Sequence, residues 1–452
     1  AERAIIGTEK RKKGVQVMKR ALVFGGGGSK GAYELGVWKA LDELGLSFDI
    51  VTGTSIGAMI GAMYVQKQYD RCLELWEQLS VEDIIANGVN LDMDIELLMS
   101  QKGKYKTLLK SYVKNKGADI TPFVKKLRTY YDAERFFSSD IEYACMCVNV
   151  TRKQPQPVFR KDMTPDTALD YIIASASCFP AFPMKEIDGE KFVDGGYYDN
   201  VPVELARSMG AQEIVAVDLK AVGKKKLHHP QKDLIYIEPQ VSLGSFLLFD
   251  QARIHRNMTL GYQDTLKKFS RCLGSIYTFS LQDKAQIIDF EDQIHRQLEQ
   301  IDDLVNRRFM SRLVKKVFHH QMIASFSQFQ EYDWPFLRML EMIAQAFQIE
   351  DSGIWKFSEF AMQVMDCANL YVSIAERAER DALHIKDAVT SLKEQSSKEI
   401  ICSIFYYMRK ADAASRRELE AIAVVMNDSF VMAYLLFAMS QLSWQNKGLS
   451  LS

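Results

Sequence analysis

Two strand-to-helix turns within residues 20–61 constrain this chain more than any other feature of its sequence. The first turn follows the short apolar stretch 21–24 and contains four consecutive glycines, residues 25–28. The second follows the stretch 48–52 and has the sequence Gly-Thr-Ser-Ile-Gly, residues 53–57, before a run of small residues. Two such turns so close together favour an α/β domain with a parallel sheet covered by helices.

Ser55 is the central residue of the second turn, whose Gly-x-Ser-x-Gly pattern is that of a nucleophile elbow. A serine hydroxyl is a poor nucleophile unless a sharp turn exposes it beside a base. Gly53 and Gly57 lack the Cβ atoms that would collide with neighbouring backbone in such a turn. One pattern of this kind is a weak signal, but the glycine-rich turn on the preceding strand strengthens it.

The glycine-rich turn has two interpretations. The backbone N–H groups of Gly26, Gly27 and Gly28 can converge on one point and stabilise a developing oxyanion beside the serine. With Gly31, these glycines also fit a dinucleotide-binding fingerprint, which predicts an acidic residue at the end of the second strand. Asp49 lies instead at the beginning of that strand, and the strand ends in the serine turn. We therefore favour the oxyanion hypothesis.

An acidic residue after a later strand is the candidate base. Asp194 follows the predicted strand 191–193 and precedes Gly195 and Gly196, which let the backbone approach a neighbouring loop closely. An aspartate in this position can also do no more than cap its own turn. All 7 histidines lie beyond residue 227, so a Ser-His-Asp triad would need a histidine from outside the predicted sheet or from its last edge. A Ser-Asp dyad is the economical alternative.

Four motifs occur in the order and spacing of the patatin-like phospholipases. They are residues 26–31, residues 53–57, the Ala-Ser block that ends at Pro180, and Asp194-Gly195-Gly196 followed by Asn200-Val201-Pro202. The chain resembles this family over residues 18–268. The resemblance implies a lipid acyl hydrolase with a three-layer α/β/α domain and no metal or other cofactor. By position, it implies that Ser55 is the nucleophile and Asp194 the base, with Gly26, Gly27 and Gly28 lining the oxyanion hole.

We expect two domains from the length of 452 residues and from the change of pattern along the chain. Residues 1–17 are an N-terminal extension, native or added. Residues 18–268 form the patatin-like catalytic domain with a mainly parallel sheet, in which residues 66–140 are a helical cap. Residues 269–452 form an all-α domain that is regulatory, docks on lipid, or joins two copies of the chain into a homo-oligomer, and the sequence does not choose among these roles.

Apolar spacing and β-branched content predict the individual elements. Strands are expected at residues 21–24, 49–52, 143–150, 191–193, 213–218 and 235–238. In the C-terminal region, helices are expected at residues 293–318, 334–347, 355–388 and 415–442.

Lysines without an acidic residue are concentrated between Lys102 and Lys116 within the predicted cap, among apolar residues at helical spacing. We favour a solvated helix that covers the core. The second hypothesis is a peripheral membrane contact, with the lysines toward anionic head groups. The whole chain has 57 basic and 58 acidic residues, so its net charge does not point to nucleic acid as a partner.

The cysteines indicate a reducing compartment, because they are 7 in number, scattered, and without a Cys-x-x-Cys pair. No signal peptide is visible in the polar, basic N-terminal residues. We therefore expect a cytoplasmic protein, peripheral at a membrane if the lysine segment binds lipid.

These observations together predict a carboxylic ester hydrolase. Its substrate is a phospholipid or another lipid ester, which Ser55 and Asp194 cleave through an acyl-enzyme. The alternative is a non-catalytic module on the same fold that binds lipid or a partner. The intact serine turn weighs against this alternative, because a module without chemistry has no reason to retain a strained elbow.

Overall fold

The computed structural model describes residues 18–79, 119–179, 181–226, 232–246, 249–308, 333–381, 396–410 and 427–442. The chain divides into two compact units, Ala1–Ser270 and Arg271–Ser452. The extension expected at residues 1–17 and the lysine segment between Lys102 and Lys116 lie outside the described residues.

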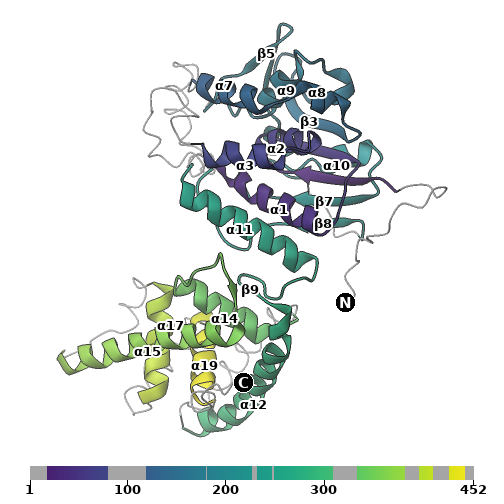
Figure 1. The fold of residues 1–452 in the computed structure, drawn as a ribbon. Helices are drawn as coiled ribbons and strands as arrows, with labels where there is room; N and C mark the ends of the chain where they lie inside the picture. The colour runs from purple at the N-terminus through teal and green to yellow at the C-terminus, as the bar shows by residue number, and fades with distance from the viewer. Residues whose placement is uncertain are drawn as a thin grey trace. The chain divides into compact units, whose positions relative to one another are not determined.

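A mainly parallel sheet forms the centre of the first unit (Figure 1). Its strands are β1 (Arg20–Phe24), β2 (Ile50–Thr54), β3 (Glu142–Asn149), β4 (Gln154–Phe159), β5 (Lys185–Ile187), β6 (Glu190–Asp194), β7 (Glu213–Val217) and β8 (Leu234–Ile237). The strand order is β5-β6-β3-β2-β1-β7-β8, and β4 pairs with β3 outside this path. Strands β1, β2, β3, β7 and β8 are parallel, whereas β4 and β6 pair antiparallel with β3, and β5 with β6.

All six strands expected in this unit are present, but β4 and β5 were not expected. Strand β4 contains Pro155 and Pro157, which argue against a central strand because proline cannot donate to a sheet ladder. Here β4 is an edge strand that pairs with β3. Strand β5 is three residues long and forms a hairpin with β6 through Asp188 and Gly189, both at positive φ.

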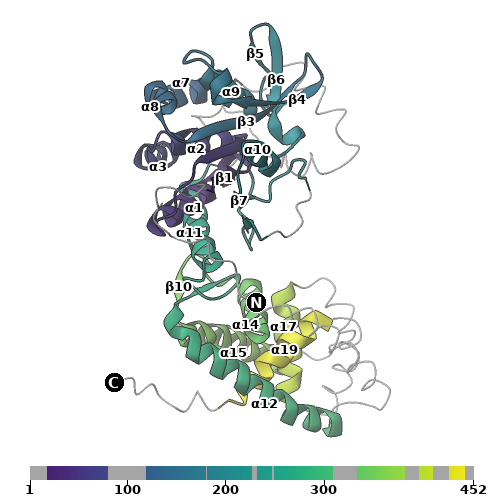
Figure 2. The ribbon, with the colours of Figure 1, turned by 90° about the vertical axis from the view of Figure 1, so that its right-hand side faces the viewer.

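Helices cover both faces of this sheet (Figures 1 and 2). They are α1 (Ala32–Glu43), α2 (Ile56–Val65), α3 (Tyr69–Glu77), α7 (Thr121–Tyr130), α8 (Ala133–Ser138), α9 (Ala168–Ser175), α10 (Val203–Ser208) and α11 (Gln251–Lys268). Successive side chains of β1 point to opposite faces. Leu22 and Phe24 belong to the larger core under α1, α2 and α9, whereas Ala21 and Val23 pack with residues of α10. The three-layer α/β/α arrangement inferred from the sequence is confirmed.

Helices α1 and α11 cross at two glycines. A Cβ on Gly36 would collide with the carbonyl of Met258, and one on Gly261 with the carbonyl of Tyr33. The backbones therefore approach closely, and the Tyr33 hydroxyl donates to Asp264 Oδ2 at 2.7 Å across the contact. This crossing holds the last helix of the unit against the first.

The second unit is mainly helical, as Figure 2 shows. Its helices are α12 (Lys284–Arg308), α14 (Pro335–Ala346), α15 (Phe357–Asp381), α17 (Ser397–Lys410) and α19 (Asn427–Ser440). The expectation of helices throughout was wrong in one place, because β9 (Thr278–Phe279) and β10 (Ile354–Trp355) form a short parallel pair. Phe279 of β9 also packs in the aromatic core of this unit, with its ring centroid 5.1 Å from that of Phe360 on α15. No helix of the described residues is long and apolar enough to cross a membrane.

Candidate active site

Ser55 lies at the sharp turn between β2 and α2, with φ 56° and ψ −126°. Residues other than glycine seldom adopt a positive φ. A serine with this backbone conformation between a strand and a helix is typical of a nucleophile elbow. The turn is tight enough that a Cβ on Gly57 would lie 2.5 Å from the carbonyl oxygens of Phe24 and Gly25. This explains the need for glycine after the serine.

Ser175, on another element, supports the backbone of the Ser55 turn through hydrogen bonds. The Ser55 N–H donates to Ser175 Oγ at 3.0 Å, and Ser175 Oγ donates to the Met146 carbonyl at 2.7 Å. Ser175 ends α9 and is completely buried. It thereby connects the turn to β3. The sequence placed Ser175 in the Ala-Ser block but gave no sign of this contact.

Asp194 ends β6 and is 6% exposed. Its Oδ1 accepts a hydrogen bond from the Gly196 N–H at 2.7 Å, and the Ser55 side chain lies near enough to its carboxyl group to lower its pKa. Burial raises the pKa of Asp194 from its ordinary value of 3.8 to about 6, although the Ser55 side chain and the Gly196 N–H act in the opposite direction. Asp194 therefore caps its own turn and also faces Ser55.

The glycine-rich turn lies beside Ser55, but not all three of its expected N–H donors are available to a ligand. The Gly26 N–H donates to the Asn200 carbonyl at 3.0 Å, so it does not point freely toward a ligand. A Cβ on Gly26 would also lie 3.0 Å from Ser55 Cβ. Gly27 and Gly28, by contrast, line the same cavity as Ser55. The expectation that Gly26 supplies an oxyanion donor is therefore revised, and Gly26 is a glycine required by close packing.

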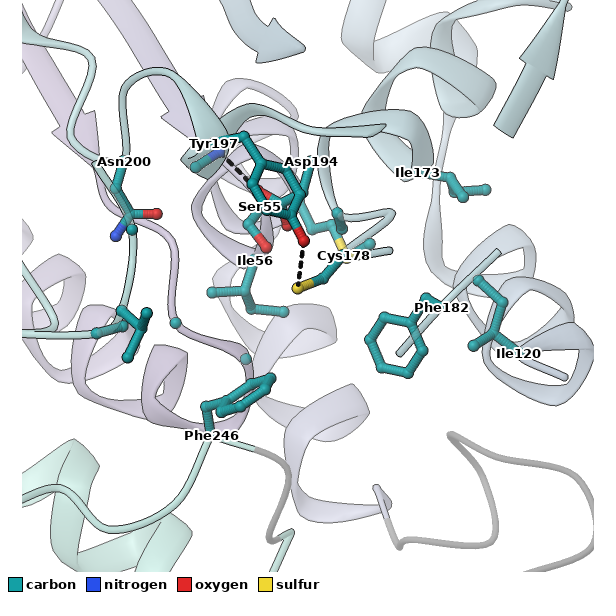
Figure 3. A pocket seen from close by; sticks show the side chains of 18 of the residues that line it. Ser55, Ile56, Ile120, Ile173, Cys178, Phe182, Asp194, Tyr197, Asn200 and Phe246 are labelled. Carbon is teal, nitrogen blue, oxygen red and sulfur yellow. Dashed lines mark hydrogen bonds between the residues drawn. The ribbon is translucent and has the colours of Figure 1, made fainter. Parts of the chain in front are cut away.

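Ser55 and Asp194 line a cavity of about 650 Å³ (Figure 3). Its large apolar lining residues are Ile56, Met59, Ile120, Phe123, Ile173, Phe182, Val222, Phe246 and Phe249. Cys178 also lies in the wall, 3.8 Å from the Tyr197 hydroxyl, and burial raises its pKa to about 12. The cavity is large and apolar enough to take a fatty acyl chain beside Ser55.

No histidine lines this cavity within the described part of the chain. His255 is exposed on α11, and its Nδ1 lies 2.8 Å from the Gln251 carbonyl. His228 and His229 lie outside the described residues. Among the described residues, the carboxylate that lines the cavity with Ser55 is that of Asp194.

Comparison with known sequences identifies this part of the chain. Residues 22–207 match the sequence profile of the family described as patatin-like phospholipase. These residues form a patatin-like phospholipase domain. The glycine turn, Ser55 and Asp194 all lie within the patatin-like match, whereas β7, β8 and α11 complete the unit beyond it.

The patatin-like domain has relatives among much longer proteins. Patatin-like phospholipase domain-containing protein 7 of Rattus norvegicus is 30% identical over 205 residues, which are 44% of this chain and 13% of that protein. Lysophospholipase NTE1 of Candida albicans is 29% identical over 201 residues, 44% of this chain and 13% of that protein. This chain therefore matches only a small part of the length of these relatives.

Among solved structures, VipD from Legionella pneumophila is 14% identical to this chain. The comparison covers 96% of this chain and 94% of VipD, with a TM-score of 0.37. A TM-score of this size does not establish a common arrangement of the two whole chains.

Proposed function

We propose that this protein is a serine acyl hydrolase that cleaves carboxylic esters of lipids, as a phospholipase A or a lysophospholipase does. The observation that carries this proposal is that Ser55, held at positive φ, and the buried carboxyl group of Asp194 line the same apolar cavity. The patatin-like relatives are named as a phospholipase and a lysophospholipase, which supports the same reaction class.

In the proposed reaction, Ser55 Oγ attacks the ester carbonyl carbon while Asp194 accepts the hydroxyl proton. The N–H groups of Gly27 and Gly28 donate to the oxyanion of the tetrahedral intermediate. When the intermediate collapses, the ester C–O bond breaks and Asp194 returns the proton to the departing alcohol. A water molecule then attacks the acyl-enzyme with Asp194 again as base, which releases the fatty acid and restores the Ser55 hydroxyl.

The environment of Asp194 suits this role. A general base works best when its pKa lies near the working pH, and the pKa of about 6 keeps Asp194 ionised at neutral pH without making it a very weak base. The apolar wall supports the proposal from the substrate side, because it can remove an acyl chain from water next to Ser55.

A fluorophosphonate probe tests the proposal on the intact chain. We expect covalent labelling of the parent protein at Ser55, none in Ser55→Ala, and strongly reduced labelling in Asp194→Asn. Hydrolysis of a panel of phospholipids and lysophospholipids, followed by mass spectrometry, should fall in the same order. A folded parent protein that neither reacts with the probe nor releases fatty acid would support the non-catalytic module instead.

A further inference from the structure

Lys224 is the one cationic residue among the described residues that line the cavity. Its backbone is fixed at the site, because its N–H donates to the Gly196 carbonyl at 2.8 Å and its carbonyl accepts from the Asn200 N–H at 2.7 Å. Both partners belong to the segment that follows Asp194. Lys224 is therefore held beside the proposed dyad, although its side chain is exposed.

The two lysines that follow are engaged elsewhere. Lys225 Nζ lies 2.8 Å from Asp218 Oδ2, and Lys226 Nζ lies 3.5 Å from the buried Asp199 carboxylate. For Lys224, no carboxylate lies within ion-pair distance in the described part of the chain. Of three consecutive lysines, the one at the cavity is thus the one whose charge is available to a ligand.

The cavity has two chemically different ends with Ser55 between them. Figure 3 shows Asn200 on one side of Ser55, and Phe182, Ile120 and Ile173 on the other. Lys224 is hydrogen-bonded through its backbone to Asn200 and so belongs to the first side. A lipid ester whose acyl chain lies against Phe182, Ile120 and Ile173 would place its alcohol portion on the side of Asn200 and Lys224.

We infer that Lys224 binds the phosphate group of the substrate's alcohol portion, and that it selects glycerophosphate lipids over neutral glycerides. This inference rests on the proposed function and adds the substrate class to it. An ammonium group is a compact point charge, and its ion pair with a phosphate does not depend on the head-group alcohol that the phosphate carries. Lys224 therefore distinguishes lipids by the presence of a phosphate and not by the identity of the head group.

A kinetic comparison tests this inference. The substrates are a short-chain lysophospholipid and the monoacylglycerol with the same acyl chain, both below the concentration at which they aggregate. In Lys224→Gln, kcat/KM for the lysophospholipid should fall about tenfold relative to the monoacylglycerol, mainly through KM, which is the scale of one charge-assisted hydrogen bond at an exposed site. Lys224→Arg should keep most of the preference, because it keeps the charge.

Lys191→Gln is the matched control. Lys191 is an exposed lysine on β6, the strand that carries Asp194, but it does not line the cavity. Its replacement removes the same charge and should leave the ratio between the two substrates unchanged. An equal change of ratio in Lys191→Gln and Lys224→Gln would attribute the effect to net charge and overturn the inference.

Binding of uncleavable ether analogues separates this inference from the proposed reaction. The probes are an alkyl ether of glycerophosphocholine and the matching alkylglycerol, measured by calorimetry with the parent protein and Lys224→Gln. Tighter binding of the phosphate analogue, lost in Lys224→Gln, supports the inference even if the parent hydrolyses neither ester, a result that would reject only the hydrolase proposal. Hydrolysis of both esters with the same ratio in parent and Lys224→Gln would overturn the phosphate role and leave the hydrolase proposal standing.

Discussion

Asn200 and Gly26 are joined by two hydrogen bonds. The Gly26 N–H donates to the Asn200 carbonyl at 3.0 Å, and Asn200 Nδ2 donates to the Gly26 carbonyl at 3.1 Å. Asn200 belongs to the segment after Asp194, and Gly26 begins the turn that contains the proposed oxyanion donors. The pair therefore sets the position of the base relative to these donors.

Asn200→Ala removes the side-chain half of this link and leaves the buried Gly26 carbonyl with one partner fewer. We expect a loss of about 1–3 kcal/mol in the free energy of unfolding, as for other unsatisfied buried groups. We also expect kcat to fall about tenfold or more, because the glycine turn is no longer held against the base. Urea unfolding and steady-state kinetics measure the two effects.

Asn257→Ala is the control for this prediction. Asn257, on α11, is also a buried asparagine. Its Nδ2 donates to the Leu243 carbonyl at 3.0 Å. It should lose stability to a similar extent while kcat stays near the parent value. An equal loss of kcat in both variants would mean that general destabilisation explains the result for Asn200.

Ser175→Ala tests the support of the elbow. The change leaves the Ser55 N–H without its acceptor at 3.0 Å, so the strained turn should relax and turnover should fall by about an order of magnitude. Ser177→Ala is the matched variant, because Ser177 Oγ bonds locally to the Ile173 carbonyl at 3.0 Å and its backbone carbonyl still accepts from Asp194. Turnover measured in parallel should separate the two serines, and equal losses would contradict a special role for Ser175.

Gly27→Ala is the cleaner test of the proposed oxyanion donors. A Cβ on Gly27 would meet only side-chain atoms, 2.7 Å from Leu219 Cδ1 and 3.0 Å from Leu219 Cβ, whereas Gly28 has φ 56° and its Cβ would collide with the Phe246 backbone carbonyl. Alanine keeps the backbone N–H, but the space that its Cβ needs should turn this N–H away from the oxyanion. We therefore expect kcat to fall by about two to three orders of magnitude in Gly27→Ala, the usual effect of losing an oxyanion donor.

Circular dichroism should show that Gly27→Ala remains folded. Gly353→Ala, in the second unit and with open space around the new Cβ, should leave turnover unchanged. Parent-like turnover in Gly27→Ala would place the oxyanion donors elsewhere.

The pH profile should report Asp194. The proposed base must be ionised to accept the Ser55 proton, and its pKa is about 6. We therefore expect kcat/KM for a soluble ester to increase with pH through about 6 and then to level off. An inflection at the ordinary carboxyl pKa of 3.8 would mean that Asp194 is not desolvated in solution.

The same raised pKa affects stability with a defined sign. Because the folded protein holds the Asp194 proton more tightly than the unfolded chain, this group stabilises the fold fully below its ordinary pKa of 3.8, and that contribution is lost as pH rises through about 6. Asp194→Asn has no such titration. From about pH 5 to about pH 8, the variant should therefore gain on the order of 1 kcal/mol in unfolding free energy relative to the parent. Urea unfolding at both pH values measures this difference, and a constant difference would contradict it.

Local patterns account for the parts of this molecule that the sequence predicted. Ser55 and Asp194 could be proposed from the sequence because a serine elbow and an acidic residue before two glycines are patterns of a few consecutive residues. The α/β/α layers followed from strands and helices that alternate along the chain. The domain limits and the lysine segment between Lys102 and Lys116 remain predictions.

Contacts between distant residues account for what the sequence did not predict. The acceptor for the Gly26 N–H is Asn200, which is 174 residues away along the chain, so no local pattern shows that this N–H is occupied. Ser175 and Lys224 take their places through hydrogen bonds to Ser55, Gly196 and Asn200, which only the folded chain reveals. Strand β4 was not predicted because its prolines argue against a strand. An edge strand tolerates them, since it pairs on one side only.

The place of β1 in the sheet has a consequence for biosynthesis. It is the first strand of the described residues, yet it lies between β2 and β7, and α1, the helix that follows it, packs against α11. A growing polypeptide leaves the ribosome with Leu22, Phe24 and Tyr33 long before their later neighbours exist. The first unit can complete its core only after translation has passed Lys268, so its earliest apolar residues are without their native neighbours until then.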